Sequence, residues 1–209
     1  MYKNVKNLLF DFGGVIMNLD KERAVSRFKE IGVANINDYL TSYRHKGIFL
    51  DYEIGKLDRP QFAAALRELT GNDKITEADV DYAWQGFLIG IPEYKFQMLK
   101  DLRKDYKVYL LSNINPSAID WAYTPAFSPT GEPIDAFFDK CYMSYKVGYA
   151  KPDREIFEYI IRDSGMIPQE TLFFDDAQKN IDAGIEFGFQ TYLTDQNEDL
   201  LKVVSQINK

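Results

Sequence analysis

Residues 5–16 read VKNLLFDFGGVI, and this stretch decides the fold. Its first part, residues 5–10, is a short and mainly apolar run that stops abruptly at Asp11, just before two consecutive glycines, Gly13 and Gly14. Short apolar runs bounded by turn residues are typical of strands buried on both faces, as in a parallel sheet. We therefore expect a strand over residues 5–10 that ends with a carboxylate at the carboxyl edge of such a sheet.

The same pattern occurs twice more further along the chain. An apolar run again ends in polar residues at YKVYLL (106–111) before Ser112 and Asn113, and at TLFF (171–174) before Asp175 and Asp176. Helical and weaker strand patterns complete the alternation, with helices over 92–104, 153–164 and 180–187 and strands over 141–144 and 191–194. Alternating strands and helices predict an α/β fold with a doubly wound, Rossmann-like parallel sheet, whose ligands bind beyond the carboxyl ends of the strands.

The spacing of the first two predicted strands indicates an insertion. A βαβ unit needs about 30 residues or slightly more, yet these two strand ends lie 101 positions apart. The interval contains no convincing strand and three helical patterns, over residues 20–31, 59–69 and 76–88. We therefore expect an all-helical cap over residues 16–92, inserted into a core made of residues 1–15 and 93–209.

Composition excludes several classes of protein and partner. The 209 residues are 45% hydrophobic and 27% charged, which is typical of a globular protein and not of a disordered, collagenous or coiled-coil chain. The net charge of −7 disfavours binding to nucleic acid or to anionic membranes. Because Cys141 is the single cysteine, no intramolecular disulfide or cysteine-based metal cluster can form, and we expect it to be a buried apolar filler.

The first residues and the lengths of the apolar runs indicate where in the cell the protein is expected. No run approaches the ~20 residues of a membrane span, and MYKNVKNLLFDF meets an aspartate too early for a secretory signal. We therefore expect a soluble cytoplasmic protein. The sequence does not determine its oligomeric state.

The polar residues at the strand ends suit one kind of chemistry. Clustered carboxylates such as Asp11, Asp175 and Asp176 favour a hard cation such as Mg²⁺, which prefers oxygen ligands. Ser112 and Asn113 offer hydroxyl and amide donors for phosphate oxygens, and Lys151 in GYAKPD offers a cation. A carboxylate nucleophile, Mg²⁺, a hydroxyl and a lysine together suit phosphoryl transfer through an aspartyl-phosphate.

Four stretches of the chain, in this order, resemble the haloacid dehalogenase-like (HAD) phosphohydrolase superfamily. They are LLFDFGGVI (8–16), VYLLSN (108–113), VGYAKPDREIF (147–157) and LFFDDAQKNIDAG (172–184). Each stretch is common by itself, but the four together span the predicted core, and the insertion resembles that superfamily's N-terminal cap. The nearest branch is the group similar to glucose-1-phosphatases and to the N-terminal domains of epoxide hydrolases.

The resemblance implies a role for each matching residue. Asp11 matches the nucleophile, and Ser112, with Asn113 beside it, matches the phosphate-binding hydroxyl. Lys151 matches the lysine that balances the charge of the phosphoaspartate. The Mg²⁺ ligands implied by the family are Asp11, Asp176, Asp175 as a second or water-mediated ligand, and the main-chain carbonyl of Gly13, while Asn180 has an orienting role.

Position 13 departs from the common family pattern. Most family phosphatases have a second aspartate there as general acid and base, whereas this chain has Gly13. A glycine keeps the carbonyl but has no proton to give, and general acid catalysis typically contributes 10²- to 10⁴-fold. A sugar-1-phosphate such as a hexose-1-phosphate compensates in part, because its anomeric alkoxide is a better leaving group. A second hypothesis is that a cap residue, His45, Asp51 or Glu53, supplies the proton.

Several alternatives stay open. One is a 2-haloacid dehalogenase, which also uses an aspartate nucleophile but needs no Mg²⁺. Another is a catalytically weakened phosphate-binding or regulatory protein, because Gly13 replaces the usual acid. Trp84, Phe87 and the aromatic residues at 121–127 either pack or stack on a sugar, and the proline-rich segment 115–139 is either a functional loop or one packed by its own aromatics. We expect the substrate to be a small phosphorylated metabolite, without predicting which one.

Overall fold

The computed structural model describes residues 2–40, 45–196 and 198–209. Its main sheet has five parallel strands in the order β5-β4-β1-β6-β7. These strands are β1 (Asn7–Phe10), β4 (Lys107–Ser112), β5 (Lys140–Met143), β6 (Thr171–Asp175) and β7 (Gln190–Leu193). Each lies within two residues of its predicted bounds, so the predicted α/β class and parallel sheet are confirmed.

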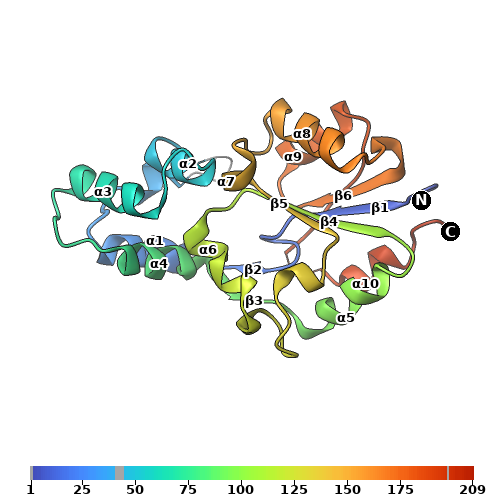
Figure 1. The fold of residues 1–209 in the computed structure, drawn as a ribbon, viewed down its shortest axis with the longest axis horizontal. Helices are drawn as coiled ribbons and strands as arrows, with labels where there is room; N and C mark the ends of the chain where they lie inside the picture. Colours follow the sequence, from blue (N-terminus) through green and yellow to red (C-terminus); the bar gives the residue numbers. More distant parts are fainter. Residues whose placement is uncertain (1, 41–44, 197) are drawn as a thin grey trace.

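Helices cover both faces of this sheet (Figure 1). One face carries α8 (Arg154–Ser164) and α9 (Gln178–Glu186), and the other carries α5 (Glu93–Leu102) and α10 (Leu200–Val204). The central strand β1 is buried at all four positions, as a strand between two helical layers must be.

Successive side chains of β1 point to opposite layers. Leu9 packs in a cluster with Phe157 of α8, whereas Leu8 and Phe10 belong to the cluster that contains Leu99 of α5. This period of two is the expected consequence of strand geometry. It explains why the run before Asp11 is apolar on both faces.

The interval between β1 and α5 forms a separate helical lobe beyond one end of the sheet, and both termini lie toward the opposite end (Figure 1). Its helices are α1 (Lys21–Glu30), α2 (Ile48–Glu53), α3 (Arg59–Thr70) and α4 (Glu77–Trp84). The sequence analysis does not predict α2 or the antiparallel pair β2 (Asn18–Leu19) and β3 (Leu88–Gly90) that joins the lobe to the core. These elements have six, two and three residues, too few for a periodic pattern to emerge.

The helix α3 begins and ends at local sequence signals. The Asp58 side chain accepts a hydrogen bond from the Gln61 main-chain amide, and the Gln61 side chain accepts one from the Asp58 amide. Pro60 lies in the first turn, and Gly71 adopts the left-handed conformation (φ 66°) just after the last residue. A capping box and a C-terminal glycine end the helix on its two sides, and the observed bounds agree with the predicted 59–69 to within one residue.

The segment 115–139 forms short helical turns rather than an extended loop. They are α6 (Pro116–Ile119) and the 3-10 turns Asp120–Tyr123, Pro125–Phe127 and Ile134–Ala136. The Phe127 ring packs against Trp121 at 5.7 Å, Phe96 at 5.6 Å and Phe137 at 5.6 Å between ring centroids. These contacts favour the interpretation of a segment held by its own aromatic residues.

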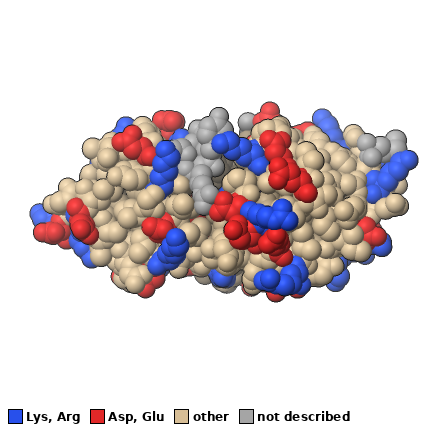
Figure 2. All heavy atoms as spheres, turned by 90° about the horizontal axis from the view of Figure 1, so that it is seen from above, with Lys and Arg blue, Asp and Glu red and all other residues tan. Residues whose placement is uncertain are grey.

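None of the helices in the described part of the chain is long and apolar enough to cross a membrane. On the face seen in Figure 2, acidic and basic side chains are interspersed over both the lobe and the core.

Candidate active site

The sheet brings the polar strand ends together. β1 lies between β4 and β6, so Asp11 follows the central strand, Asp175 ends one neighbour and Ser112 ends the other. The Asp11 amide continues the pairing by donating to the Phe174 carbonyl at 2.9 Å. Because parallel strands end at the same edge, residues about 60 to 160 positions apart in sequence become neighbours.

Lys151 lies at the centre of this group. Its Nζ is 3.0 Å from Asp11 Oδ1 and 2.6 Å from Asp175 Oδ2, and the residue is only 1% exposed. Burial by itself lowers the pKa of this ammonium group, but the two carboxylates outweigh that effect and raise it. Lys151 therefore stays charged and partly neutralises two aspartates that would otherwise repel each other.

Asp175 is the most constrained of the three acids. Its Oδ1 accepts hydrogen bonds from the Ala177 amide and from Asn180 Nδ2, both at 2.9 Å, while its Oδ2 receives Lys151. Asn180 thus orients a carboxylate, which is the role we expect for it at a position where many relatives have a further carboxylate. The hydrogen bonds leave Asp175 in one fixed orientation inside the protein.

Asp176 completes a group of carboxylates that fits a cation. Oxygens of Asp11, Asp175 and Asp176 lie within 4.8 Å of one another, and Asp176 is the exposed member. Burial raises the pKa of Asp11. The two neighbouring acids raise this pKa further, whereas Lys151 lowers it. Three carboxylates with one lysine leave excess negative charge at this edge, and oxygen ligands of this kind are those that Mg²⁺ prefers.

The structure gives Asn113 a contact that the sequence analysis does not predict. Its Nδ2 donates to the Lys151 carbonyl at 2.8 Å, and its Oδ1 accepts from the Lys151 amide at 2.7 Å. This reciprocal pair fixes the backbone of Lys151, so the side chain positions the lysine. Ser112 is buried, 2% exposed, and lines the pocket described below.

A side chain at either of the two glycines after Asp11 would meet a different obstacle. Gly14 has a φ of +75°, and a Cβ there would lie 2.0 Å from Asp176 Oδ2, so only glycine lets this acid approach the loop. A Cβ on Gly13 would lie 2.8 Å from Leu19 Cδ1. Leu19 therefore occupies the space next to position 13, where most family members have the acidic side chain.

Lys95 is a second buried lysine near the site, and the sequence analysis misses it. From α5, its Nζ donates to the Val15 carbonyl at 2.5 Å and to the Ile16 carbonyl at 3.3 Å. Burial lowers its pKa to about 8. Lys95 thus holds the loop after Asp11 in place. In the sequence it is only a lysine within a predicted amphipathic helix, and nothing else there indicates this contact.

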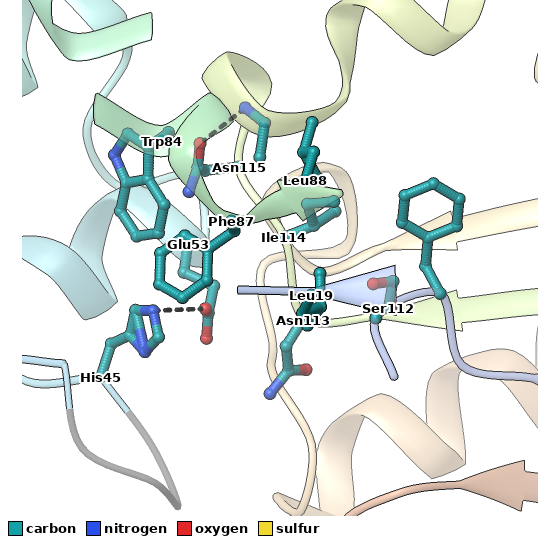
Figure 3. Close-up of a pocket in the computed structure, with 13 residues that line it drawn as sticks. Leu19, His45, Glu53, Trp84, Phe87, Leu88, Ser112, Asn113, Ile114 and Asn115 are labelled. Atoms are coloured by element: carbon teal, nitrogen blue, oxygen red, sulfur yellow. Dashed lines mark hydrogen bonds and ion pairs between the residues drawn. The ribbon is translucent and has the colours of Figure 1, made fainter. Parts of the chain in front are cut away.

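A pocket of about 130 Å³ opens beside these strand ends, between the core and the helical lobe (Figure 3). Its core side includes Gly13, Ser112 and Asn113. Its apolar walls are formed by Phe12, Leu19, Trp84, Phe87, Leu88, Ile114 and Ala118. The aromatic residues Trp84 and Phe87 therefore line the pocket as well as packing on each other, with their ring centroids 5.7 Å apart.

Two of the three acid candidates in the lobe line this pocket. His45 and Glu53 do so, with His45 Nε2 3.7 Å from Glu53 Oε2 (Figure 3). Asp51 does not line it; its half-exposed side chain is 3.6 Å from Lys56. The structure therefore separates Asp51 from the other two candidates.

Comparison with known proteins supports this description. The family model of the haloacid dehalogenase-like hydrolases matches residues 5–188. The D-ribitol-5-phosphate phosphatase of Bacteroides thetaiotaomicron is 43% identical over 195 residues, which cover 93% of this chain and 94% of that protein.

Solved structures agree over the whole chain. A HAD-like family hydrolase from Porphyromonas gingivalis is 41% identical, with a TM-score of 0.92 and 97% of each chain covered. A wild-type HAD family enzyme from B. thetaiotaomicron, in complex with magnesium and inorganic phosphate, is 38% identical, with a TM-score of 0.86, covering 95% of this chain and 98% of that one. The chain belongs to the haloacid dehalogenase-like hydrolase family.

Proposed function

We propose that this protein is a Mg²⁺-dependent phosphatase that hydrolyses a small phosphate monoester through an aspartyl-phosphate on Asp11. The observation that carries the proposal is the buried contact of Lys151 with Asp11 and Asp175, with Asp176 grouped beside these two acids. The Mg²⁺ and phosphate bound by the related B. thetaiotaomicron enzyme support it.

Each residue has a defined task in this mechanism. An Asp11 oxygen forms a bond to phosphorus while the bond from phosphorus to the leaving oxygen breaks, and the alkoxide takes up a proton from solvent water. Water then forms a new bond to phosphorus and gives up a proton to the solvent, while the bond from phosphorus to Asp11 breaks and inorganic phosphate is released. Lys151 balances the charge on the transferred group, and Ser112 binds its oxygens.

The cation would be held by Asp11, Asp176 and the Gly13 carbonyl, with Asp175 behind them. When bound, Mg²⁺ neutralises charge that develops on the phosphoryl oxygens. The 2-haloacid dehalogenase alternative is disfavoured, because halide displacement makes no use of three carboxylates gathered within 4.8 Å.

We also propose residues 16–92 as the cap and residues 1–15 with 93–209 as the core. The helices α1 to α4 and the paired strands β2 and β3 support this division. Closure of such a cap excludes bulk water from the reacting phosphate.

The size of the pocket and the activity of a relative together narrow the range of substrates that we propose. Pockets for drug-sized ligands measure roughly 300–1,000 Å³, whereas this one measures about 130 Å³. We therefore propose a polyol or sugar monophosphate of a few carbons, with D-ribitol 5-phosphate as the first candidate because of the 43% identical relative. A hexose-1-phosphate, which suits the missing acid at Gly13, is the second.

The experiment is a screen of phosphate release with and without metal. We expect turnover of small polyol and sugar monophosphates in Mg²⁺, at least about tenfold lower kcat/KM for purine nucleotides, and loss of activity in EDTA that Mg²⁺ restores. Activity that survives EDTA would contradict the metal requirement. Comparison of 1-phosphates with 5- and 6-phosphates tests the leaving-group argument, which predicts faster turnover of the 1-phosphates.

A further inference from the structure

The pocket has a second polar end, on the helical lobe, that the proposed mechanism does not use. The core end carries Ser112 and Asn113, and the lobe end carries Glu53 and His45 (Figure 3). Apolar side chains, among them Leu19 and Phe87, separate the two ends. For a phosphate bound at the core end, Glu53 would lie at the opposite end of the pocket.

Glu53 is held firmly in this place. It is the last residue of α2, and its main-chain carbonyl accepts a hydrogen bond of 2.6 Å from Ser144 Oγ, at the start of the one-turn helix α7 (Ser144–Val147) of the core. Ser144 also accepts from the Ile114 amide at 2.9 Å. One serine thus links the Glu53 backbone to the segment just after Ser112, so in this conformation the lobe end of the pocket is hydrogen-bonded to the core end.

The Glu53 carboxylate has few partners among the residues that the structure describes. Its side chain is 5% exposed, and toward the residues that the structure describes it makes no hydrogen bond; its nearest ion-pair partner among them is His45 at 3.7 Å. A carboxylate has about four acceptor sites, and a buried one is costly unless hydrogen-bond donors meet it. Hydroxyl groups of a ligand are donors of the required kind.

His45 lies beside this carboxylate. Its ring stacks on Trp84, with centroids 5.5 Å apart and planes 12° from parallel, and Trp84 itself is buried. The imidazole is therefore held by an aromatic face while one nitrogen points to Glu53.

We infer that Glu53 determines specificity by accepting hydrogen bonds from hydroxyl groups of the leaving group. The enzyme then selects monophosphates of uncharged polyols and sugars over monophosphates of plain alcohols. This inference rests on the proposed phosphatase function. The carbon skeleton of such a ligand lies along the apolar walls, while its hydroxyls meet the carboxylate. A volume of about 130 Å³ suits a chain of a few carbons.

The test compares two substrates of equal carbon number, D-ribitol 5-phosphate and n-pentyl phosphate, in Mg²⁺. We expect the wild-type kcat/KM to favour ribitol phosphate by about 100-fold or more. We expect Glu53→Gln to reduce this preference by about tenfold, and Glu53→Met, which has no comparable acceptor, to reduce it further, mainly through the KM for ribitol phosphate. The ratio is measured within one preparation, so a loss of folded enzyme cancels.

Glu68→Gln is the matched control, because Glu68 is exposed on α3 and does not line the pocket. It should keep the wild-type preference. Equal use of the two substrates by wild type, or a preference unchanged in Glu53→Met, would overturn the inference and leave the phosphatase function standing. Absence of Mg²⁺-dependent phosphate release from either substrate would overturn the proposed function and this inference with it.

Discussion

Replacing Asp11 by asparagine is expected to lower kcat for phosphate release by at least about 10⁴-fold. Asparagine keeps the size of the side chain but removes the charged oxygen that attacks phosphorus, and loss of a covalent nucleophile costs factors of this order or more. The measurement is steady-state phosphate release in Mg²⁺, together with thermal melting to establish that the variant is folded.

The control is the same substitution, aspartate to asparagine, at a position away from the site. Asp51 lies outside the pocket in a half-exposed pair with Lys56. We expect Asp51→Asn to stay within about twofold of wild type, because an exposed ion pair contributes roughly 0–1 kcal/mol. If Asp11→Asn kept more than about 1% of the wild-type rate, Asp11 would not be the nucleophile.

Replacing Lys151 by methionine is expected to reduce the free energy of unfolding by about 3–5 kcal/mol in the absence of metal. Methionine fills a similar volume, but Asp11 and Asp175 then lose the cation that lies 3.0 and 2.6 Å from them. Activity should also fall sharply, since charge on the transferred phosphoryl group is no longer balanced. Urea unfolding in EDTA measures the loss of stability.

Addition of Mg²⁺ separates this explanation from a packing defect. A cation bound by the carboxylates compensates in part for the missing lysine, so Mg²⁺ should stabilise Lys151→Met more than it stabilises wild type. Lys95→Met is the matched control, since Lys95 is equally buried but contacts main-chain carbonyls. Equal stabilisation of all three proteins by Mg²⁺ would contradict the electrostatic account.

The core of the fold could be predicted from the sequence because its signals are local. Each buried strand is a short apolar run, and each run stops at a polar residue that the parallel sheet then brings to one edge. Asp11, Ser112 and the Asp175–Asp176 pair could therefore be grouped without coordinates. Lys151 follows no predicted strand directly; it could be grouped with these residues only as the cation in GYAKPD, and the family resemblance gave it a specific role.

The contacts that the sequence analysis missed depend on packing between distant segments. Nothing near Asn113 indicates that its amide pairs with the backbone of Lys151, 38 positions away. Lys95 reaches the loop after Asp11 from a different element. The side-chain directions of His45, Asp51 and Glu53 also depend on how the helical lobe meets the core, so the sequence could propose all three but not choose among them.

Gly13 illustrates how the structure sharpens a sequence observation. The sequence indicates only that an acid is missing, whereas the structure places Leu19 beside the glycine, where a Cβ would come within 2.8 Å of its Cδ1. The space next to position 13 is thus apolar. Position 13 therefore has no acidic side chain, and one could be placed there only if Leu19 moved aside.

The most direct test of the central claim is capture of a phosphoryl mimic on Asp11. Beryllium fluoride binds aspartate nucleophiles as an analogue of the acyl phosphate, and ¹⁹F NMR reports the bound form. The account predicts bound resonances for wild type in Mg²⁺ that disappear in EDTA and are absent in Asp11→Asn. Bound resonances that persist in Asp11→Asn, or wild-type enzyme that releases phosphate but captures no beryllium fluoride, would contradict it.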